Sequence, residues 1–260
     1  AKLRPMQRVA VEIAQNVADP GLLIIEAPMG EGKTEAAFAA AETMAQRSGR
    51  GGVCIALPTM ATTDAMFGRV HEWLRHLPHA GDGRDRSVYL AHGKAGLNDE
   101  FQGIARASFA MSPGTVDVDG GEGAPRRERG TVAEPTEDVV VSEWLQGRKK
   151  GVLANFLVCT VDQVLMGALA MKHLALRQLA LVNKVVVIDE CHAYDDYMQR
   201  YLKRALEWLG GTRTPVILLS ATLPENLRDG LVEAYQSGWK ASCGEMSRPA
   251  AKRLKPWQRQ

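Results

Sequence analysis

The fold of this chain is decided by one stretch of its sequence: Leu22-Leu23-Ile24-Ile25-Glu26-Ala27-Pro28-Met29-Gly30-Glu31-Gly32-Lys33-Thr34. The apolar residues at its start predict a short buried strand, and the Ala- and Glu-rich residues 34–47 predict a helix. Two glycines and a Lys-Thr pair stand between these two elements. Because a phosphate-binding loop requires this order of strand, glycine-rich loop and helix, the stretch predicts such a loop.

The residue types of the loop match the chemistry of phosphate binding. Gly30 and Gly32 allow backbone N–H groups to converge on a β-phosphate without clashes from β-carbons, and the helix start adds its positive dipole end. Lys33 is placed to reach the β- and γ-phosphates, and the Thr34 hydroxyl is placed to bind Mg²⁺. The alternative is a glycine-rich turn with an incidental Lys-Thr pair. The predicted nucleotide-binding residues of the loop are Met29, Gly30, Glu31, Gly32, Lys33 and Thr34.

Outside the loop, short β-branched runs alternate with helical segments. Runs that are apolar throughout indicate strands buried on both faces, and their alternation with helices indicates right-handed crossovers. The sequence therefore predicts an α/β fold with a mainly parallel sheet flanked by helices on both faces. The expected strands are 22–25, 53–57, 88–90, 157–160, 185–188 and 216–219, and the expected helices are 34–47, 63–77, 161–178 and 194–209.

The composition excludes several classes of protein. Hydrophobic residues make up 45% and charged residues 24% of the 260 positions, which excludes a disordered, collagen-like or disulfide-stapled chain. No apolar run reaches the roughly 18 residues of a membrane span, and no secretory signal is present. The four cysteines lack metal-ligand spacing and predict reduced, buried thiols, so a cytoplasmic protein is expected. The net charge of +2 is too small to indicate nucleic-acid binding by itself.

Two segments depart from the alternating pattern. Residues 112–138 are rich in glycine, proline and mixed charge and poor in apolar residues, which predicts a mobile surface insertion. The pattern fades again after Gly238, and residues 237–260 are expected to form a linker or basic tail. We therefore expect one lobe over residues 1–236, followed by a linker towards a second lobe that is absent from the chain.

Two adjacent acids, Asp189 and Glu190, directly follow the expected strand 185–188. Ligands of open α/β sheets bind at the carboxyl ends of the strands. Asp189 is expected to hold Mg²⁺, and Glu190 is expected to orient the attacking water. An Asp-Glu pair alone is weak evidence, because acids also begin helices. Joined to the phosphate-binding loop, the pair predicts a hydrolysis centre.

The third motif is Ser220-Ala221-Thr222, which follows the expected strand 216–219. By itself it would be an ordinary helix N-cap ahead of Pro224. Because it comes in order after the other two motifs, we expect Ser220 and Thr222 to couple the nucleotide site to movement of the lobe.

Together these motifs resemble a superfamily 2 helicase motor of the DExH type, in which the first lobe has a RecA-like fold. Ala27 replaces the first glycine of the strict loop pattern, as is common in helicase-type motors. The chain is most similar to the CRISPR-associated helicase-nuclease of type I systems, especially the subtype I-E form, over roughly residues 3–235. Cys191 stands where valine is frequent in that family. The matching stretches are Arg4-Pro5-Met6-Gln7, Ile25-Glu26-Ala27-Pro28, Ala56-Leu57-Pro58-Thr59, Leu90-Ala91-His92-Gly93, Val158 to Leu165, Asp189 to Asp195 and Leu218 to Pro224.

The resemblance implies further site residues. Gln7 would contact the adenine, and His192 would join Lys33, Asp189 and Glu190 as a catalytic residue that couples the nucleotide state to motion. Threonines can also cap a helix, and His192 can satisfy a local backbone group, so these alternatives stay open. The residues that would contact the backbone of single-stranded DNA are Thr59, Thr62, Thr63, Thr160, Asp162 and Gln163.

The resemblance also implies a function. The chain would be the ATP-binding lobe of an ATP-dependent translocase or helicase for single-stranded DNA in CRISPR interference, with ATP and Mg²⁺ as cofactors. Its other partners would be a second RecA-like lobe, an HD-type nuclease domain and a Cascade-type surveillance complex. No histidine is followed by aspartate, so we expect no nuclease activity, and without arginine fingers we expect slow hydrolysis. The alternatives are a DExH RNA helicase lobe and an ATP-gated binding module without useful turnover.

Overall fold

The computed structural model describes residues 4–16, 21–77, 86–111, 139–140, 151–169 and 174–247. They form a seven-stranded sheet in the order β1-β7-β6-β2-β5-β3-β4, and every neighbouring pair is parallel. The predicted α/β fold with a parallel sheet is confirmed. The strands are β1 Leu22–Glu26, β2 Val53–Leu57, β3 Arg86–Ala91, β4 Val139–Val140, β5 Phe156–Thr160, β6 Val185–Ile188 and β7 Val216–Ser220.

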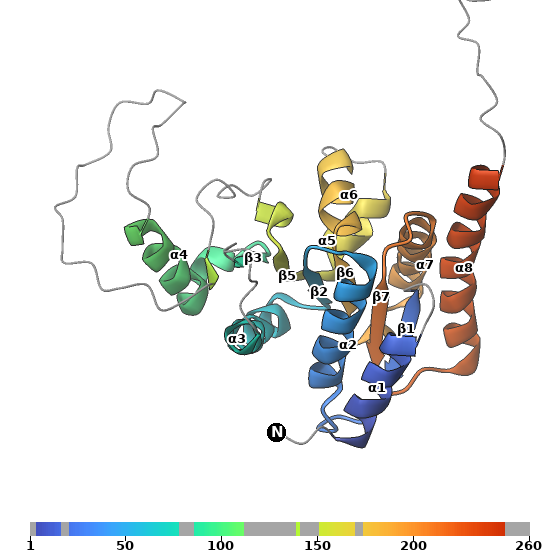
Figure 1. Ribbon diagram of the computed structural model, residues 1–260, viewed down its shortest axis with the longest axis horizontal. Coiled ribbons are helices and arrows are strands. Elements are labelled where there is room, and N and C mark those ends of the chain that lie inside the picture. The colour runs from blue at the N-terminus through green and yellow to red at the C-terminus, as the bar shows by residue number, and fades with distance from the viewer. Residues whose placement is uncertain are drawn as a thin grey trace, which may run out of the picture.

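Helices cover both faces of the sheet because its central strands are almost wholly apolar. Val185 and Val187 of β6 face one hydrophobic core, and Val186 and Ile188 face the other, as the two-residue period of a strand requires. Figure 1 shows α1 beside α2 and α7 beside α8. The first core includes residues of α1 Pro5–Asn16, α2 Lys33–Ser48, α3 Met60–His76 and α4 Asp99–Met111, and the second includes residues of α5 Val161–Leu165, α6 Leu174–Val182, α7 Asp196–Gly211 and α8 Glu225–Ser247.

One expected helix, residues 161–178, is broken in the structure. α5 is followed by a 3₁₀ turn, Met166–Ala168, and α6 is a separate helix. Within the turn, a β-carbon added to Gly167 would come 2.9 Å from Leu181 Cδ1, so the turn packs closely against α6. The apolar pattern did not reveal the break because both helices contribute to the same hydrophobic core.

α8 continues past Gly238, the residue after which the sequence pattern fades. Gly238 lies at a close crossing of α8 with α7. A β-carbon added there would come 1.7 Å from the Glu207 carbonyl oxygen. A β-carbon added to Gly210 of α7 would likewise come 2.0 Å from the Tyr235 carbonyl oxygen. The glycine that suggested the end of the ordered fold is therefore a contact point between two helices, and the expected linker is helical as far as residue 247.

The predictions about the insertion, the tail and the division into a lobe and a linker stay predictions. The expected insertion at 112–138 and the tail after residue 247 lie outside the described residues. The division into a lobe and a linker towards a second lobe is likewise still a prediction. Among the described residues, no helix combines the length and the apolar composition that a membrane crossing needs.

The parallel arrangement places the carboxyl ends of the strands along one edge of the sheet. β1, β7 and β6 are neighbours in one half, and β2, β5 and β3 are neighbours in the other. The loops that follow β1, β7 and β6 therefore lie next to one another. The loops that follow β2, β5 and β3 lie next to one another in the same way. These two groups of loops carry the candidate site.

Candidate functional site

The loop between β1 and α2 needs its glycines for conformational reasons. Gly30 and Gly32 have φ angles of 82° and 84°, in the left-handed region that residues with a β-carbon rarely adopt. At Gly32, the N-cap of α2, a β-carbon would also lie 3.1 Å from Gln7 Nε2. The loop can therefore bring the first N–H groups of α2 close to an anion.

The Lys33 side chain is the clearest sign that this loop holds an anion. Its ammonium nitrogen is buried and has no hydrogen-bond partner among the described residues, and the residue is only 9% exposed. A buried charge without a partner is strongly unfavourable, so the site fits a ligand that brings negative charge to this nitrogen. Lys33 lines a cavity of about 560 Å³ together with Arg4, Gln7, Met29, Gly30, Gly32, Thr34, Glu35, Arg69, Asp189 and Glu190.

The cavity brings together most of the residues that the sequence suggested for nucleotide binding. Glu31 is the exception, because it is exposed in the loop and does not line the cavity. Arg4 lines the cavity although the sequence analysis gave it no role. Its Nη1 donates to the Gly30 carbonyl at 3.0 Å, and its backbone N–H donates to Gln7 Oε1 at 2.9 Å. Arg4 thereby ties the start of α1 to the loop and orients the Gln7 amide.

Asp189 and Glu190 reach the cavity from the end of β6. Asp189 Oδ1 accepts a hydrogen bond from the Glu190 backbone N–H at 2.8 Å. Burial raises the pKa of the Asp189 carboxyl above its ordinary value, and this hydrogen bond opposes the rise. The Tyr194 hydroxyl donates to the Asp189 carbonyl at 2.9 Å and braces the turn.

Glu190 adopts a backbone conformation that is unfavourable for its residue type. Its φ angle is 52°, and the left-handed region costs a residue with a β-carbon about 1–2 kcal/mol. Such strain persists only where the surrounding structure enforces it, and it is common at functional sites. The conformation places the Glu190 carboxylate at the cavity beside Asp189.

His192 connects the hydrolysis centre with the third motif. Its Nε2 lies 3.3 Å from Glu190 Oε2, and its Nδ1 lies 3.1 Å from Ser220 Oγ. The Ser220 hydroxyl donates to the Thr222 carbonyl at 2.9 Å, so its oxygen is left to accept from His192. The ring donates to both partners only as the imidazolium. Thr222 takes part in this series of hydrogen bonds through its backbone carbonyl.

Glu26 is a site residue that sequence reasoning missed. Its Oε1 accepts from the Leu223 backbone N–H at 3.0 Å, and its Oε2 accepts from Arg228 Nη2 at 2.8 Å. The hydrogen bond from Leu223, followed by that from Arg228, lowers the pKa of the Glu26 carboxyl. Glu26 thereby joins the end of β1 to the loop that follows Ser220. No local signal could reveal this, because the partners are almost the whole lobe apart in sequence.

The threonines after β2 cap α3, as the sequence analysis allowed. Thr59 Oγ1 accepts from the Thr62 backbone N–H at 3.2 Å, and Thr62 Oγ1 accepts from the Thr59 backbone N–H at 3.3 Å, which is a capping box. This cap starts α3 at Met60, earlier than residue 63. Thr59 and Thr62 remain exposed, but Thr63 is fully buried and donates to the Thr59 carbonyl at 2.6 Å. Thr63 therefore has no surface to offer to a nucleic acid.

The residues after β5 divide in the same way. Thr160 is buried at the end of the strand, whereas Asp162 is exposed on the first turn of α5. Gln163 is half-buried, and its Oε1 accepts from Arg177 Nη1 of α6. Because β2 and β5 are paired in the sheet, Asp162 and Gln163 share an edge with Thr59 and Thr62.

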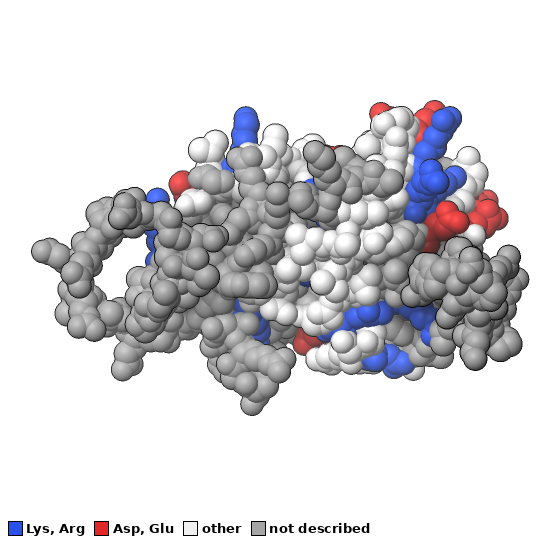
Figure 2. Space-filling model, turned by 90° about the horizontal axis from the view of Figure 1, so that it is seen from above, with Lys and Arg blue, Asp and Glu red and all other residues white. Residues whose placement is uncertain are grey.

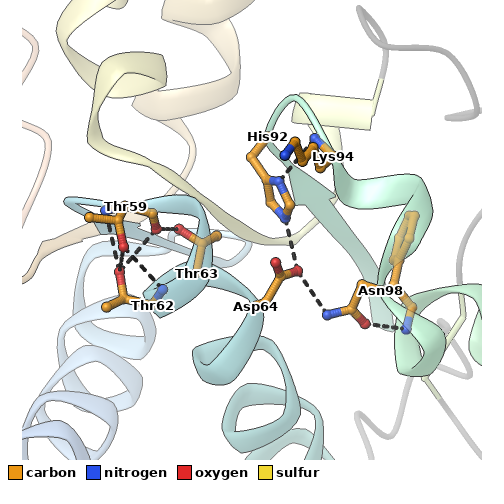
Figure 3. Close-up of polar contacts among 8 residues, drawn as sticks. Thr59, Thr62, Thr63, Asp64, His92, Lys94 and Asn98 are labelled. Atoms are coloured by element: carbon orange, nitrogen blue, oxygen red, sulfur yellow. Dashed lines mark hydrogen bonds and ion pairs between the residues drawn. The ribbon is translucent and has the colours of Figure 1, made fainter.

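A buried histidine network ties this edge to the next strand, β3. His92 Nε2 and Asn98 Nδ2 both lie 2.9 Å from Asp64 Oδ1. Figure 3 shows both side chains pointing toward the Asp64 carboxylate. The His92 side chain is fully buried, and its Nδ1 accepts from the Lys94 backbone N–H at 3.2 Å. Asn98 also caps α4 by accepting from the Phe101 N–H. The network therefore fixes the loop after β3 and the start of α4 against α3.

Comparison with known proteins identifies the lobe. A family model described as DEAD/DEAH box helicase matches residues 132–230. The CRISPR-associated nuclease/helicase Cas3 of Streptococcus thermophilus is 41% identical over 236 residues, which cover 90% of this chain and 23% of that protein. The chain is similar to the DEAD/DEAH-type helicase part of Cas3 nuclease/helicases. The predicted resemblance to the CRISPR-associated helicase-nuclease is thus confirmed.

Solved structures agree with this assignment. The ATP complex of T. fusca Cas3 matches with a TM-score of 0.71 and 36% identity, over 96% of this chain and 24% of that one. A chain of a structure described as "CRISPR RNA-guided surveillance complex, pre-nicking" matches with a TM-score of 0.57 and 34% identity, over 90% of this chain and 20% of that one. The RecA-like fold is confirmed. The chain spans about a quarter of the length of these relatives.

The residue types that line the cavity suit a phosphate ligand with a divalent cation. Thr34 and Asp189 line the cavity and supply the hydroxyl and carboxylate oxygens that suit Mg²⁺, which usually keeps water and phosphate oxygens as its other ligands. Among the described residues, no group of three or more His, Cys, Asp or Glu side chains is placed to hold a metal ion.

Proposed function

We propose that the chain is the ATP-binding lobe of an ATP-dependent translocase or helicase that moves on single-stranded DNA in CRISPR interference. The observation that carries the proposal is the buried Lys33 ammonium, which has no hydrogen-bond partner among the described residues and shares one cavity with Asp189 and Glu190. The ATP complex of the T. fusca relative supports ATP as the ligand. The subtype I-E assignment goes with this proposal.

In this proposal each residue of the cavity has a separate task. Lys33 and the first N–H groups of α2 bind the phosphates, while Thr34 and Asp189 hold Mg²⁺. The bound Mg²⁺ supplies positive charge that neutralises the phosphate oxygens. Glu190 orients water and accepts its proton, and Gln7 contacts the adenine. Met29, Gly30 and Gly32 shape the loop around the phosphates.

Coupling to movement would pass through the contacts of His192. The imidazole bridges Glu190 and Ser220, and Ser220 bonds the Thr222 carbonyl. A change at the Glu190 carboxylate therefore alters the hydrogen bonds of the loop after β7. Glu26 holds the same loop at Leu223, so the movement would be transmitted through a backbone segment that is anchored at both ends.

The nucleic-acid interface that we propose lies at the carboxyl ends of β2 and β5. Thr59, Thr62, Asp162 and Gln163 present polar groups there, and Thr160 is buried at the end of β5. Hydroxyls and amides such as these suit contacts with a nucleic-acid backbone without base readout. Figure 2 shows another face of the molecule, on which basic and acidic side chains lie in small groups among uncharged residues.

The proposed partners are single-stranded DNA, a second RecA-like lobe, an HD nuclease domain and a Cascade-type surveillance complex. The Cas3 relatives and the match to a chain of the surveillance complex support these partners. A cytoplasmic location goes with them. Slow hydrolysis and the lack of nuclease activity by this chain alone stay predictions. The alternatives, an RNA helicase lobe and an ATP-gated binding module, are separated by the experiment below.

The test is nucleotide binding and hydrolysis by the purified chain with Mg²⁺. Lys33→Met should weaken ATP binding at least about tenfold, whereas Glu190→Gln should keep binding and remove whatever hydrolysis the chain shows. Lys240→Met, at an exposed lysine of α8 outside the cavity, is the matched control and should change neither.

Single strands of DNA and RNA of equal length and sequence then identify the track. Greater stimulation of hydrolysis by DNA supports the proposal, and greater stimulation by RNA favours the RNA helicase. Unchanged ATP binding by Lys33→Met would overturn the assignment of the nucleotide site.

A further inference from the structure

Arg69 lines the nucleotide cavity although it belongs to α3. None of the three motifs contains it, and no role was assigned to it above. It lies ten residues after Thr59, the N-cap of α3, and it reaches the first turn of α2. Its guanidinium forms an ion pair with Glu35, the residue that directly follows Thr34.

The ion pair between Arg69 and Glu35 is too exposed to be explained by stability alone. The two side chains are 48% and 53% exposed, and exposed pairs typically contribute about 0–1 kcal/mol. Burial tends to raise the pKa of the Glu35 carboxyl, but its own backbone N–H and Arg69 lower it on balance. Glu35 is therefore ionised, and the pair stands charged at the mouth of the cavity.

The balance of charge in the cavity indicates what the pair is for. Three cationic residues, Arg4, Lys33 and Arg69, and three acidic residues, Glu35, Asp189 and Glu190, line it. An anionic phosphate chain meets three carboxylates there, and Lys33 is the one unpartnered buried cation among the described residues. Arg69 lines the same cavity and can bring a second cation to the phosphates.

We propose that Arg69 is a nucleotide-binding residue that contacts the phosphate chain, and that Glu35 holds it at the cavity mouth and competes with the phosphates for it. The proposal rests on the proposed function, because it needs a phosphate ligand in this cavity. A guanidinium binds phosphate oxygens through two parallel N–H groups and stays charged at any physiological pH. The half-exposed side chain is free to leave the carboxylate without unfolding α3.

The proposal predicts opposite effects from the two members of the pair. Arg69→Gln should weaken ATP binding about tenfold, because a charge-assisted contact is lost. ADP should lose less, and adenosine should lose nothing. Glu35→Gln should instead tighten ATP binding about threefold, because it frees Arg69 and removes a negative charge. The double variant Glu35→Gln with Arg69→Gln should lose that gain.

The measurement is calorimetric titration of the chain with ATP, ADP and adenosine, together with its thermal unfolding temperature without nucleotide. Arg75→Gln is the matched control, because it removes the same charge from the same helix outside the cavity. It should leave the ATP affinity within about twofold of the original.

Two results would overturn the proposal. One is an unchanged ATP affinity in Arg69→Gln, and the other is a loss of affinity in both single variants that follows an equal fall in unfolding temperature. Either would make the pair a tie between α2 and α3. The proposed function fails separately, if Lys33→Met binds ATP as tightly as the original chain. Arg69→Lys adds a check, since it should recover part of the ATP affinity but not the two-pronged contact.

Discussion

The Lys33 ammonium, the Asp189 carboxyl and the Glu190 backbone are each held in an unfavourable state. The buried Lys33 ammonium has no hydrogen-bond partner among the described residues, burial raises the pKa of Asp189, and Glu190 has a left-handed φ angle. A residue chosen for stability would avoid all three conditions. At the scale of single residues, the amino acids of this cavity therefore suit ligand binding better than they suit the stability of the ligand-free chain.

Lys33→Met should consequently stabilise the ligand-free chain by about 1 kcal/mol. Methionine has a similar length and removes a buried ammonium that has no hydrogen-bond partner among the described residues. The lost attraction between Lys33 and the Asp189 carboxyl offsets part of this gain. The free energy of unfolding in urea at pH 7, without nucleotide, measures the effect. Lys240→Met should stay within about 0.5 kcal/mol of the original, because Lys240 is exposed. A loss of stability in Lys33→Met would show that the ammonium has a partner in solution.

At the scale of helices and strands, close approach between elements depends on glycine. Gly238 of α8 and Gly210 of α7 lie where a β-carbon would overlap the carbonyl oxygens of Glu207 and Tyr235. Two glycines inside helices cost helix propensity, but they allow the two helices to pack at short distance. The N-terminal end of α8 follows the Ser220 loop, so this packing also positions the coupling motif.

Two glycines of α8 should respond to alanine in opposite directions. Gly238→Ala should destabilise the chain by about 3 kcal/mol, because its β-carbon would meet the Glu207 carbonyl oxygen and force α7 and α8 apart. Gly244→Ala should stabilise it by about 0.5–1 kcal/mol, because a β-carbon there meets no atom within 4 Å and alanine favours the helix. Thermal unfolding of both variants checks the pair. Equal effects would contradict the close crossing.

At the scale of the whole molecule, tertiary packing buries one cation deep between elements. Lys184 Nζ donates to the Ala180 carbonyl at 2.6 Å and to the Val152 carbonyl at 3.3 Å. Burial lowers its pKa to about 8, against the nearby thiols of Cys54 and Cys159, which tend to raise it. The unfolded chain therefore holds this proton more tightly than the folded chain does.

This difference predicts how stability depends on pH. Between about pH 8 and the ordinary lysine pKa of 10.5, the unfolded state binds more protons than the folded state. The Lys184 contribution to unfolding free energy should therefore rise with pH across that window, by up to about 1.4 kcal/mol per unit. Urea unfolding from pH 7 to 9 measures the slope, and Lys184→Met should lack the rise.

The Cys159 thiol should change the unfolding free energy with pH in the opposite direction, so its contribution must be removed in a control. A hydrogen bond between the Cys159 and Cys54 thiols, together with burial, raises the pKa of the Cys159 thiol well above its ordinary value. The folded state then holds that proton more tightly, so stability falls as the pH passes the ordinary thiol pKa of 9.0. A Cys159→Ser background removes this opposing contribution. An equal slope with and without Lys184 in that background would contradict the prediction.

The parts of the fold that could be predicted are those whose signal lies within one short stretch of sequence. The strand, glycine-rich loop and helix of residues 22–47 lie within one stretch, and the apolar runs announced six of the seven strands. β4 was missed because two residues carry no periodic signal. The break after α5 was missed because apolar pattern reports burial and not continuity of the helix.

The pairs that complete the site could not be predicted in the same way. Arg69 and Glu35 come from different helices, and Glu26 meets Leu223 only because β1 pairs with β7. The burial of Thr63 could not be foreseen either, because Thr62 and Thr63 look alike in sequence and differ only in the face of α3 that they occupy.

The sequence by itself determined the local chemistry: a glycine-rich loop ahead of Lys33, and two acids after a buried strand. Backbone conformation and side-chain type act over a few residues, so they can be read directly from the chain. Only the tertiary structure decided which of these groups share a cavity and that Arg69 faces Glu35. It also decided that the Lys33 ammonium has no hydrogen-bond partner within the described part of the chain. Strand order and helix packing set those distances, because they sum weak contacts across the whole lobe that no short stretch contains.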